Sequence, residues 1–202
     1  LVMDAQNEPV WGKGVPSSVG LLRYSKRQLE TLACESCHIP RLYAPALQSI
    51  DWTVLTEDGE PRREYRGATG DPLQAATLVE GYAPALLRST DSDGRSLLAP
   101  HNLVTTWYWL AGDPPRPVAL RDLQAAWFDG DAHAAEVVAA LDGNGDGFLA
   151  EAELVLDSEA KQSAIAARLA AQGVTNARIA GDVQPYSINH DVTDSAGAIR
   201  DC

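Results

Sequence analysis

Apolar residues first recur at helical spacing in residues 25–37. Ser25 and Gln28 have the spacing of a capping box, and Leu29 begins an apolar side that continues toward the end of the segment. Pro40 then stops regular helical structure. The pattern therefore predicts one helix over 25–37.

The spacing changes to an alternation after this helix. Ile50, Trp52 and Val54 occupy every second position, which predicts a strand with one buried face. The acidic, glycine-containing run 57–60 predicts a turn, and a second extended piece follows through Tyr65. Two short extended segments are therefore expected here.

The middle of the chain has little periodicity. Residues 68–100 are rich in Gly, Pro, Ser and Asp, so they predict mainly loop. The run 101–110 is dense in aromatic and β-branched residues and ends at the Gly- and Pro-containing breaker 112–115. Its consecutive aromatic side chains have two interpretations, because they could fill a core or line a flat cofactor.

Helical spacing returns in the second half of the chain. Ala-rich stretches predict helices over 119–128, 132–141 and 158–172, and Gly173 closes the last of them. The predicted fold class is therefore mainly α, with few short strands and long loops.

Composition narrows the classes of partner. The 202 residues are 45% hydrophobic and 22% charged, which suits a globular chain with a real core. The net charge of −12 makes nucleic acid and anionic lipid poor partners. Arg168 interrupts the Ala-rich stretch 164–171, and no apolar run reaches the roughly 18 residues that a membrane helix needs. No transmembrane segment is expected.

Cys34, Cys37 and His38 form a CxxCH motif, which is typical of covalent haem attachment. The two thiols can reach the two vinyl groups of one porphyrin, and the adjoining histidine is an axial iron ligand in such sites. Zinc is the main alternative, but a structural zinc site usually has four N or S ligands, and the chain has no second CxxC. Thiol redox chemistry would need a βαβ setting that the flanks do not offer. Haem c is the predicted cofactor.

A second axial ligand has to be found elsewhere. Met3 is the single methionine and lies at the terminus, so ligation by two histidines is favoured. His133 lies among acidic residues and is the weakest candidate, because a solvated setting is expected there. His101, next to the aromatic run, and His190, after an extended apolar piece, are equal candidates, for this haem or for a neighbouring one.

Two of the three cysteines belong to the CxxCH motif, and the third is Cys202. It is either a free or intermolecularly bonded thiol, or the first cysteine of a further haem motif. The second interpretation makes Cys202 a haem-binding residue.

Residues 142–153 match the EF-hand loop D-x-N-x-D-G-x₅-E at every defining position. This pattern places oxygen ligands around Ca²⁺, and the glycine at its sixth position permits the sharp bend. The predicted ligands are Asp142, Asn144, Asp146, the carbonyl of Phe148, and Glu153. A lone loop of this kind predicts a structural site that pins two helices together, with the leaving helix beginning at Leu154.

A boundary between two regions is predicted at 113–117, where Pro and Gly accumulate. Residues 1–115 form the expected haem-binding region. Residues 116–202 form a helical region that contains the EF-hand-like calcium loop and a C-terminal segment.

Three segments resemble parts of exported multihaem c-type cytochromes, especially octahaem cytochromes of the tetrathionate reductase type. They are residues 32–40, which contain CxxCHIP, the Asp-Trp-Thr of 51–53 and the Pro-His-Asn of 100–102. The resemblance covers 25–66 and 100–110. It implies a periplasmic or extracellular protein whose remote histidines ligate haems of neighbouring segments. Other haem-bearing segments or redox proteins are the implied partners, and association with further copies stays open.

Electron transfer through a bis-His haem, in a chain stabilised by calcium, is the favoured function. Two alternatives remain. One is part of a multihaem reductase of small sulfur or nitrogen oxyanions, so enzymatic activity is left undecided. The other is a non-redox calcium-binding module that uses CxxCH for zinc.

Overall fold

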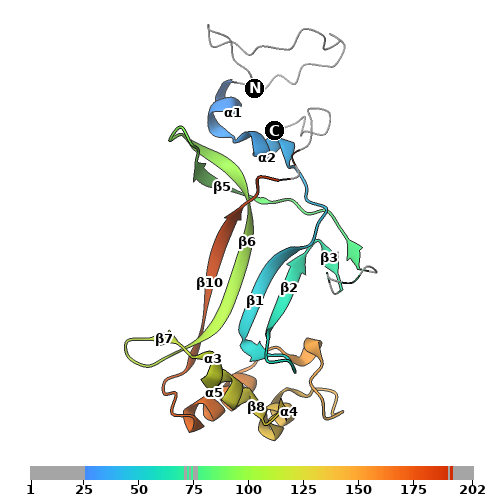
Figure 1. Ribbon diagram of the computed structural model, residues 1–202, viewed down its shortest axis with the longest axis vertical. Coiled ribbons are helices and arrows are strands. Elements are labelled where there is room, and N and C mark those ends of the chain that lie inside the picture. The colour runs from blue at the N-terminus through green and yellow to red at the C-terminus, as the bar shows by residue number, and fades with distance from the viewer. Residues whose placement is uncertain (1–25, 71, 73, 75–76, 191, 193–202) are drawn as a thin grey trace.

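The computed structural model describes residues 26–70, 72, 74, 77–190 and 192. The molecule is elongated, with two short helices at one end, a group of helices at the other, and a long twisted sheet between them (Figure 1). The short helices are α1 (Lys26–Thr31) and α2 (Cys34–His38). The opposite end contains α3 (Leu120–Trp127), α4 (Ala135–Leu141), the 3₁₀ turn η1 (Glu151–Glu153) and α5 (Glu159–Ala171).

The sheet is mixed and is organised around one long strand, β6. Its strands are β1 (Ala46–Leu55), β2 (Pro61–Arg66), β5 (Ala85–Thr90), β6 (Ser96–Ala111), β7 (Arg116–Pro117) and β10 (Arg178–Ser187). The main order is β10-β6-β1-β2, and β5 and β7 also pair with β6. Among the strand pairs that the structure describes in this sheet, β1–β6 is parallel and the others are antiparallel. The other strands form two small sheets, of β3 (Ala68–Thr69) with β4 (Leu78–Val79), and of β8 (Phe128–Asp129) with β9 (Ala132–His133).

The aromatic run of β6 alternates between the two sides of the sheet, as strand geometry requires. Trp109 is buried and donates its indole N–H to the carbonyl of Thr53 at 3.1 Å. Trp107 is 44% exposed and lies over Gly181 of β10, where an added Cβ would come within 2.6 Å of the indole ring. Tyr108 points to the other side and bonds Asp182. Trp109 therefore fills the core, in agreement with the first of the two interpretations.

The helical end contains the larger core. Side chains of α3, α4 and α5 pack with the ends of β1 and β6 around Trp127, which is fully buried. Arg168 of α5 links these elements, because its guanidinium bonds the carbonyl of Ala126 at 2.6 Å and the carboxylates of Asp129 and Glu136 at 2.7 and 2.9 Å. A cation at the C-terminal carbonyls of α3 also favours that helix.

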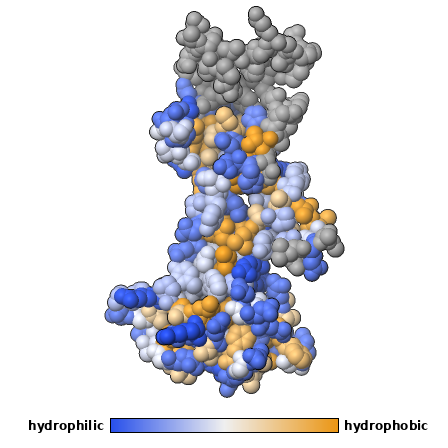
Figure 2. All heavy atoms as spheres, in the orientation of Figure 1, coloured by the Kyte–Doolittle hydropathy of each residue, from blue (hydrophilic) through white to orange (hydrophobic). Residues whose placement is uncertain are grey.

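The α2 end has a much smaller core. Ile39, Leu42 and Ile188 are buried there, and Tyr82 packs against them. Between the two ends no helix of the described residues covers the sheet (Figure 1), and hydrophobic residues are visible along the middle of the molecule (Figure 2).

The predicted fold class is wrong. The described residues are 25% helical and 38% strand, so the chain is a mixed sheet with helices rather than mainly α. The three Ala-rich helices are confirmed as α3, α4 and α5, although α4 begins only at Ala135 because Ala132–His133 form β9. Both extended segments are confirmed as β1 and β2.

The loop predicted over 68–100 is also wrong, because it contains β5 and the first part of β6. Residues 85–90 pair with residues 96–101, and the composition of these segments did not predict this pairing. The single helix predicted over 25–37 is split. Leu32 forms a bridge to Leu98, and the N–H of Ala33 bonds the Leu98 carbonyl at 2.8 Å, so the chain leaves helical geometry to meet β6.

A helix long and apolar enough to cross a bilayer is not found among the described residues.

Candidate functional sites

The CxxCH motif forms α2, a single helical turn. Cys34 and Cys37 are three residues apart and His38 is four residues from Cys34, so helical geometry places all three side chains on one face. Cys34 is exposed, whereas Cys37 is 7% exposed. Ser36 anchors the turn, because its hydroxyl donates to the Leu98 carbonyl of β6 at 2.6 Å. A single ligand could therefore bind both thiols and the imidazole.

His101 is buried on β6, at 7% exposure. Its Nδ1 lies 2.9 Å from the carbonyl oxygen of Ala99, and its Nε2 lies 3.2 Å from the hydroxyl of Ser187 on β10. A carbonyl only accepts, so the proton is on Nδ1. The lone pair of Nε2 then faces the Ser187 hydroxyl. This tautomer, with Nδ1–H bonded to a backbone carbonyl, is the one that metal-ligating histidines commonly adopt.

The other two histidines differ from each other. His190 is exposed and follows Ile188 of the small core at the α2 end. His133 lies at the helical end, stacked on Phe128 with 4.8 Å between ring centroids. Its Nε2 lies 3.0 Å from the Leu55 carbonyl. The solvated setting expected for His133 is wrong, because the β8–β9 pair turns the ring inward against Phe128.

Cys202 and Met3 lie outside the described residues. The haem-binding role of Cys202 therefore stays a prediction.

The predicted calcium loop is closed by hydrogen bonds between its own groups. Asp142 accepts the N–H of Gly147 at 2.8 Å and that of Gly145 at 2.6 Å. Glu153 accepts the N–H groups of Gly143 and Asn144 through Oε1, at 2.9 and 3.2 Å. The bond from Gly147, followed by the other loop N–H groups, lowers the pKa of Asp142 below its ordinary value. The loop thus brings its first and last predicted ligand residues to one backbone turn.

The other predicted side-chain ligands of the loop, Asn144 and Asp146, also offer oxygen atoms. Asn144 accepts from the N–H of Asp146 at 2.8 Å, and Asp146 accepts from the N–H of Phe148 at 2.9 Å. Groups of three His, Cys, Asp or Glu side chains placed to hold one ion are not found in the described part of the chain. The donor set itself, of carboxylates, one amide and one carbonyl, has the chemistry that Ca²⁺ prefers.

The leaving side of the loop differs from the prediction. Leu154 does not begin a helix, since η1 ends at Glu153 and α5 starts only at Glu159. Leu154 and Leu156 are both buried in the core of the helical end. Residues two apart share a side only in extended chain, so burying both prevents a helix here.

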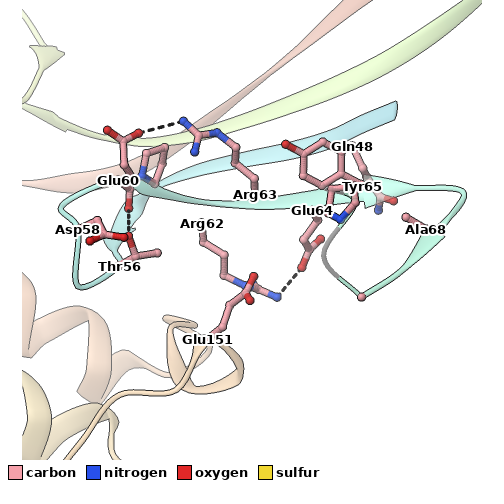
Figure 3. A pocket seen from close by; sticks show the side chains of 13 residues that line it. Gln48, Thr56, Asp58, Glu60, Arg62, Arg63, Glu64, Tyr65, Ala68 and Glu151 are labelled. Atoms are coloured by element: carbon pink, nitrogen blue, oxygen red, sulfur yellow. Dashed lines mark hydrogen bonds and ion pairs between the residues drawn. The ribbon is translucent and has the colours of Figure 1, made fainter. Parts of the chain in front are cut away.

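A cavity of about 710 Å³, which was not predicted from the sequence, lies between the β1–β2 hairpin and η1 (Figure 3). Its charged side chains largely pair with one another. Arg62 bonds Glu64 at 2.6 Å, and Arg63 bonds Glu60 at 3.0 Å. Glu151 of η1 lies on the opposite wall (Figure 3). The described lining holds no His or Cys.

No family model matches the chain, and no curated protein matches it. A solved structure, the crystal structure of octaheme cytochrome c from Shewanella oneidensis, is similar to 87% of this chain with a TM-score of 0.40 and 14% identity. The similarity covers 44% of that structure, so this chain spans less than half of its length.

Proposed function

We propose that the chain is a c-type cytochrome, or a segment of a multihaem one, that transfers electrons outside the cytoplasm. The observation that carries the proposal is α2, which presents two thiols and an imidazole on one helical face. In this proposal Cys34 and Cys37 form the thioether links and His38 is an axial ligand. Haem supplies a one-electron iron couple when bound.

The small core of the α2 end supports this proposal. Only Ile39, Leu42 and Ile188 form its buried apolar cluster among the described residues. A cluster of three side chains buries little apolar surface. A covalently attached porphyrin would add apolar surface at this end.

His101 is proposed as the second axial ligand, with His190 as the competitor. The bond from Nδ1 to Ala99 fixes the ring and leaves Nε2 as the acceptor atom. The Ser187 hydroxyl that faces Nε2 can rotate about its side chain, so it is easily replaced by a stronger ligand.

Calcium is proposed as a structural ion in the loop of residues 142–153. The loop lies between α4 and the extended piece that leads to α5, so an ion there would tie the two to each other. Its ligands would be Asp142, Asn144, Asp146, Glu153 and the Phe148 carbonyl.

The haem proposal is tested by the mass of the denatured polypeptide after expression with a haem-attachment system. The wild-type chain should carry one added haem for its CxxCH, and Cys34→Ala should lose covalent retention. Ser36→Ala is the matched control, because it changes a variable position of the motif and removes only the bond to Leu98. A wild-type polypeptide without added mass would refute the proposal and favour zinc.

The axial ligand is tested by the spin state of the iron in visible and electron paramagnetic resonance spectra. His101→Ala should convert a low-spin haem to a high-spin one, while His190→Ala and His133→Ala should leave it low-spin. Conversion by His190→Ala alone would assign the second ligand to His190 instead.

A further inference from the structure

In the described part of the chain, one edge of β6 has no strand partner over a short stretch. β5 pairs with β6 up to His101, opposite Ala85. β1 pairs with the same edge only from Thr105, opposite Ser49. Residues 102–104 between these points have β10 on the other edge but no strand on this one.

Two side chains take over the hydrogen bonds in this gap. The amide of Asn102 donates to the carbonyl of Leu47 at 2.8 Å. The guanidinium of Arg66 donates from Nη2 to the carbonyl of Leu103 at 3.0 Å. Both side chains are therefore held in place by backbone on the two sides of the gap.

A cavity of about 140 Å³ remains between them. Its lining residues are Arg66, Tyr82, Ala83, Pro84, Ala85, His101, Asn102 and Leu103. Four buried side-chain polar atoms lack a hydrogen-bond partner among the described residues, and two of them belong to this lining. These two are the donor Nε of Arg66 and the acceptor Oδ1 of Asn102. Leaving such atoms unpaired is destabilising, so a polar occupant is expected in the cavity.

The charge of Arg66 narrows the choice of occupant. None of its hydrogen bonds or ion pairs within the described residues is to a carboxylate. A cation with a buried, unpaired N–H favours an anion nearby. Burial raises the pKa of the neighbouring Tyr82 hydroxyl, which stays a protonated donor at neutral pH.

We propose that this gap is a binding site for a single carboxylate group, held by Arg66 and oriented by Asn102. The volume fits this class, because pockets for larger organic ligands measure roughly 300–1,000 Å³. The carboxylate accepts from Nε of Arg66, and a water that bridges to the carboxylate donates to Oδ1 of Asn102.

Two sources could supply the carboxylate. One is a small free acid such as formate. The other is a propionate arm of the haem, since Tyr82 of the lining also packs against the small core that follows α2. The second source rests on the haem attachment proposed above, which the polypeptide mass checks independently.

The test uses the ferrous holoprotein and the Nε–H resonance of Arg66 in ¹⁵N-correlated NMR spectra. Sodium formate is titrated against sodium chloride at constant ionic strength. A saturable shift with formate alone supports the site and assigns it to a free acid. No shift, together with a nuclear Overhauser contact from Nε–H to a propionate methylene, supports the site and assigns it to the haem.

Arg66→Lys keeps the charge and can still reach Leu103, but it lacks Nε. It should weaken formate binding about tenfold or more, which corresponds to the loss of one charge-assisted hydrogen bond. Arg63→Lys on the same strand is the control, since Arg63 pairs with Glu60 and should leave formate binding unchanged. In the propionate case, Arg66→Lys should shift the haem midpoint potential and Arg63→Lys should not.

An Nε–H resonance that responds to no formate and shows no propionate contact would overturn the proposal. The gap would then contain water only. Equal formate responses in wild type and in Arg66→Lys would also overturn it, because the anion would then bind elsewhere.

Discussion

Among the described residues, the two ends of the sheet bury different amounts of apolar surface. At the helical end, 14 buried residues form one cluster around Trp127. At the α2 end, the buried cluster consists of Ile39, Leu42 and Ile188. The same strand, β6, runs into both ends, so the contrast comes from what packs against it.

Among the described residues, this difference separates a part of the molecule with a large apolar core from a part with a small one, next to which haem attachment is proposed. The helical end buries enough apolar area to specify its packing, and its polar links such as Arg168 only add to it. The α2 end presents polar and sulfur side chains on a single helical turn. We therefore expect that end to be the less stable one, and the proposed haem to stabilise it.

The largest expected effect is at the helical end. Trp127→Ala removes a fully buried indole and should lower the free energy of unfolding by about 3–5 kcal/mol. Leu42→Ala is the counterpart at the α2 end, where the loss should be about 2 kcal/mol because few apolar neighbours surround the side chain. Urea unfolding followed by circular dichroism measures both.

An equal loss of unfolding free energy in the two variants, or a larger loss in Leu42→Ala, would contradict the proposed difference between the two ends. Trp127→Phe serves as a control for the ring, because its indole N–H has no partner in the described part of the chain. That variant should lose less than Trp127→Ala.

Calcium should stabilise the helical end and leave the α2 end unchanged. At a calcium concentration 100 times the dissociation constant, the gain in unfolding free energy is about 2.7 kcal/mol. Glu153→Gln should abolish this gain, because it removes the closing carboxylate. Glu151→Gln, two residues earlier and outside the predicted ligand set, should retain it.

Hydrogen exchange locates the effect of calcium. Protection should rise at residues 142–153 and not at the amide of Ile39. A calcium gain that survives Glu153→Gln would place the ion outside this loop.

The smallest expected effect is the response of the calcium-free loop to acid. The pKa of Asp142 is lowered by backbone N–H groups, so the ionised carboxylate stabilises the loop above its ordinary pKa of 3.8. This contribution is lost as the pH falls from that value through the lowered pKa. The amide of Gly147 should therefore lose exchange protection below about pH 4.

Asp142→Asn should remove this pH dependence. The amide of Ile39, which bonds the Glu35 carbonyl rather than a carboxylate, is the internal reference. Identical acid profiles for Gly147 in wild type and in Asp142→Asn would contradict the role of Asp142.

Features that depend on neighbouring residues were predictable from the sequence. α3, α4 and α5 follow from helical spacing of apolar residues, and the turn of CxxCH and the loop of 142–153 follow from consecutive positions. In each of these features, hydrogen bonds join residues a few positions apart. A pattern over neighbouring residues therefore contains the information that specifies the local structure. The haem and calcium assignments remain proposals built on these local patterns.

Features that depend on distant residues were decided only by the tertiary structure. β10 contains Gly181 and Pro185, which are unfavourable in strands, yet it pairs with β6 along ten residues. Its pairing also brings Ser187 to His101, and the end of β5 leaves the gap that Arg66 fills. Strand pairing joins segments tens of residues apart, and each strand gains its stability from partners that its own sequence does not contain.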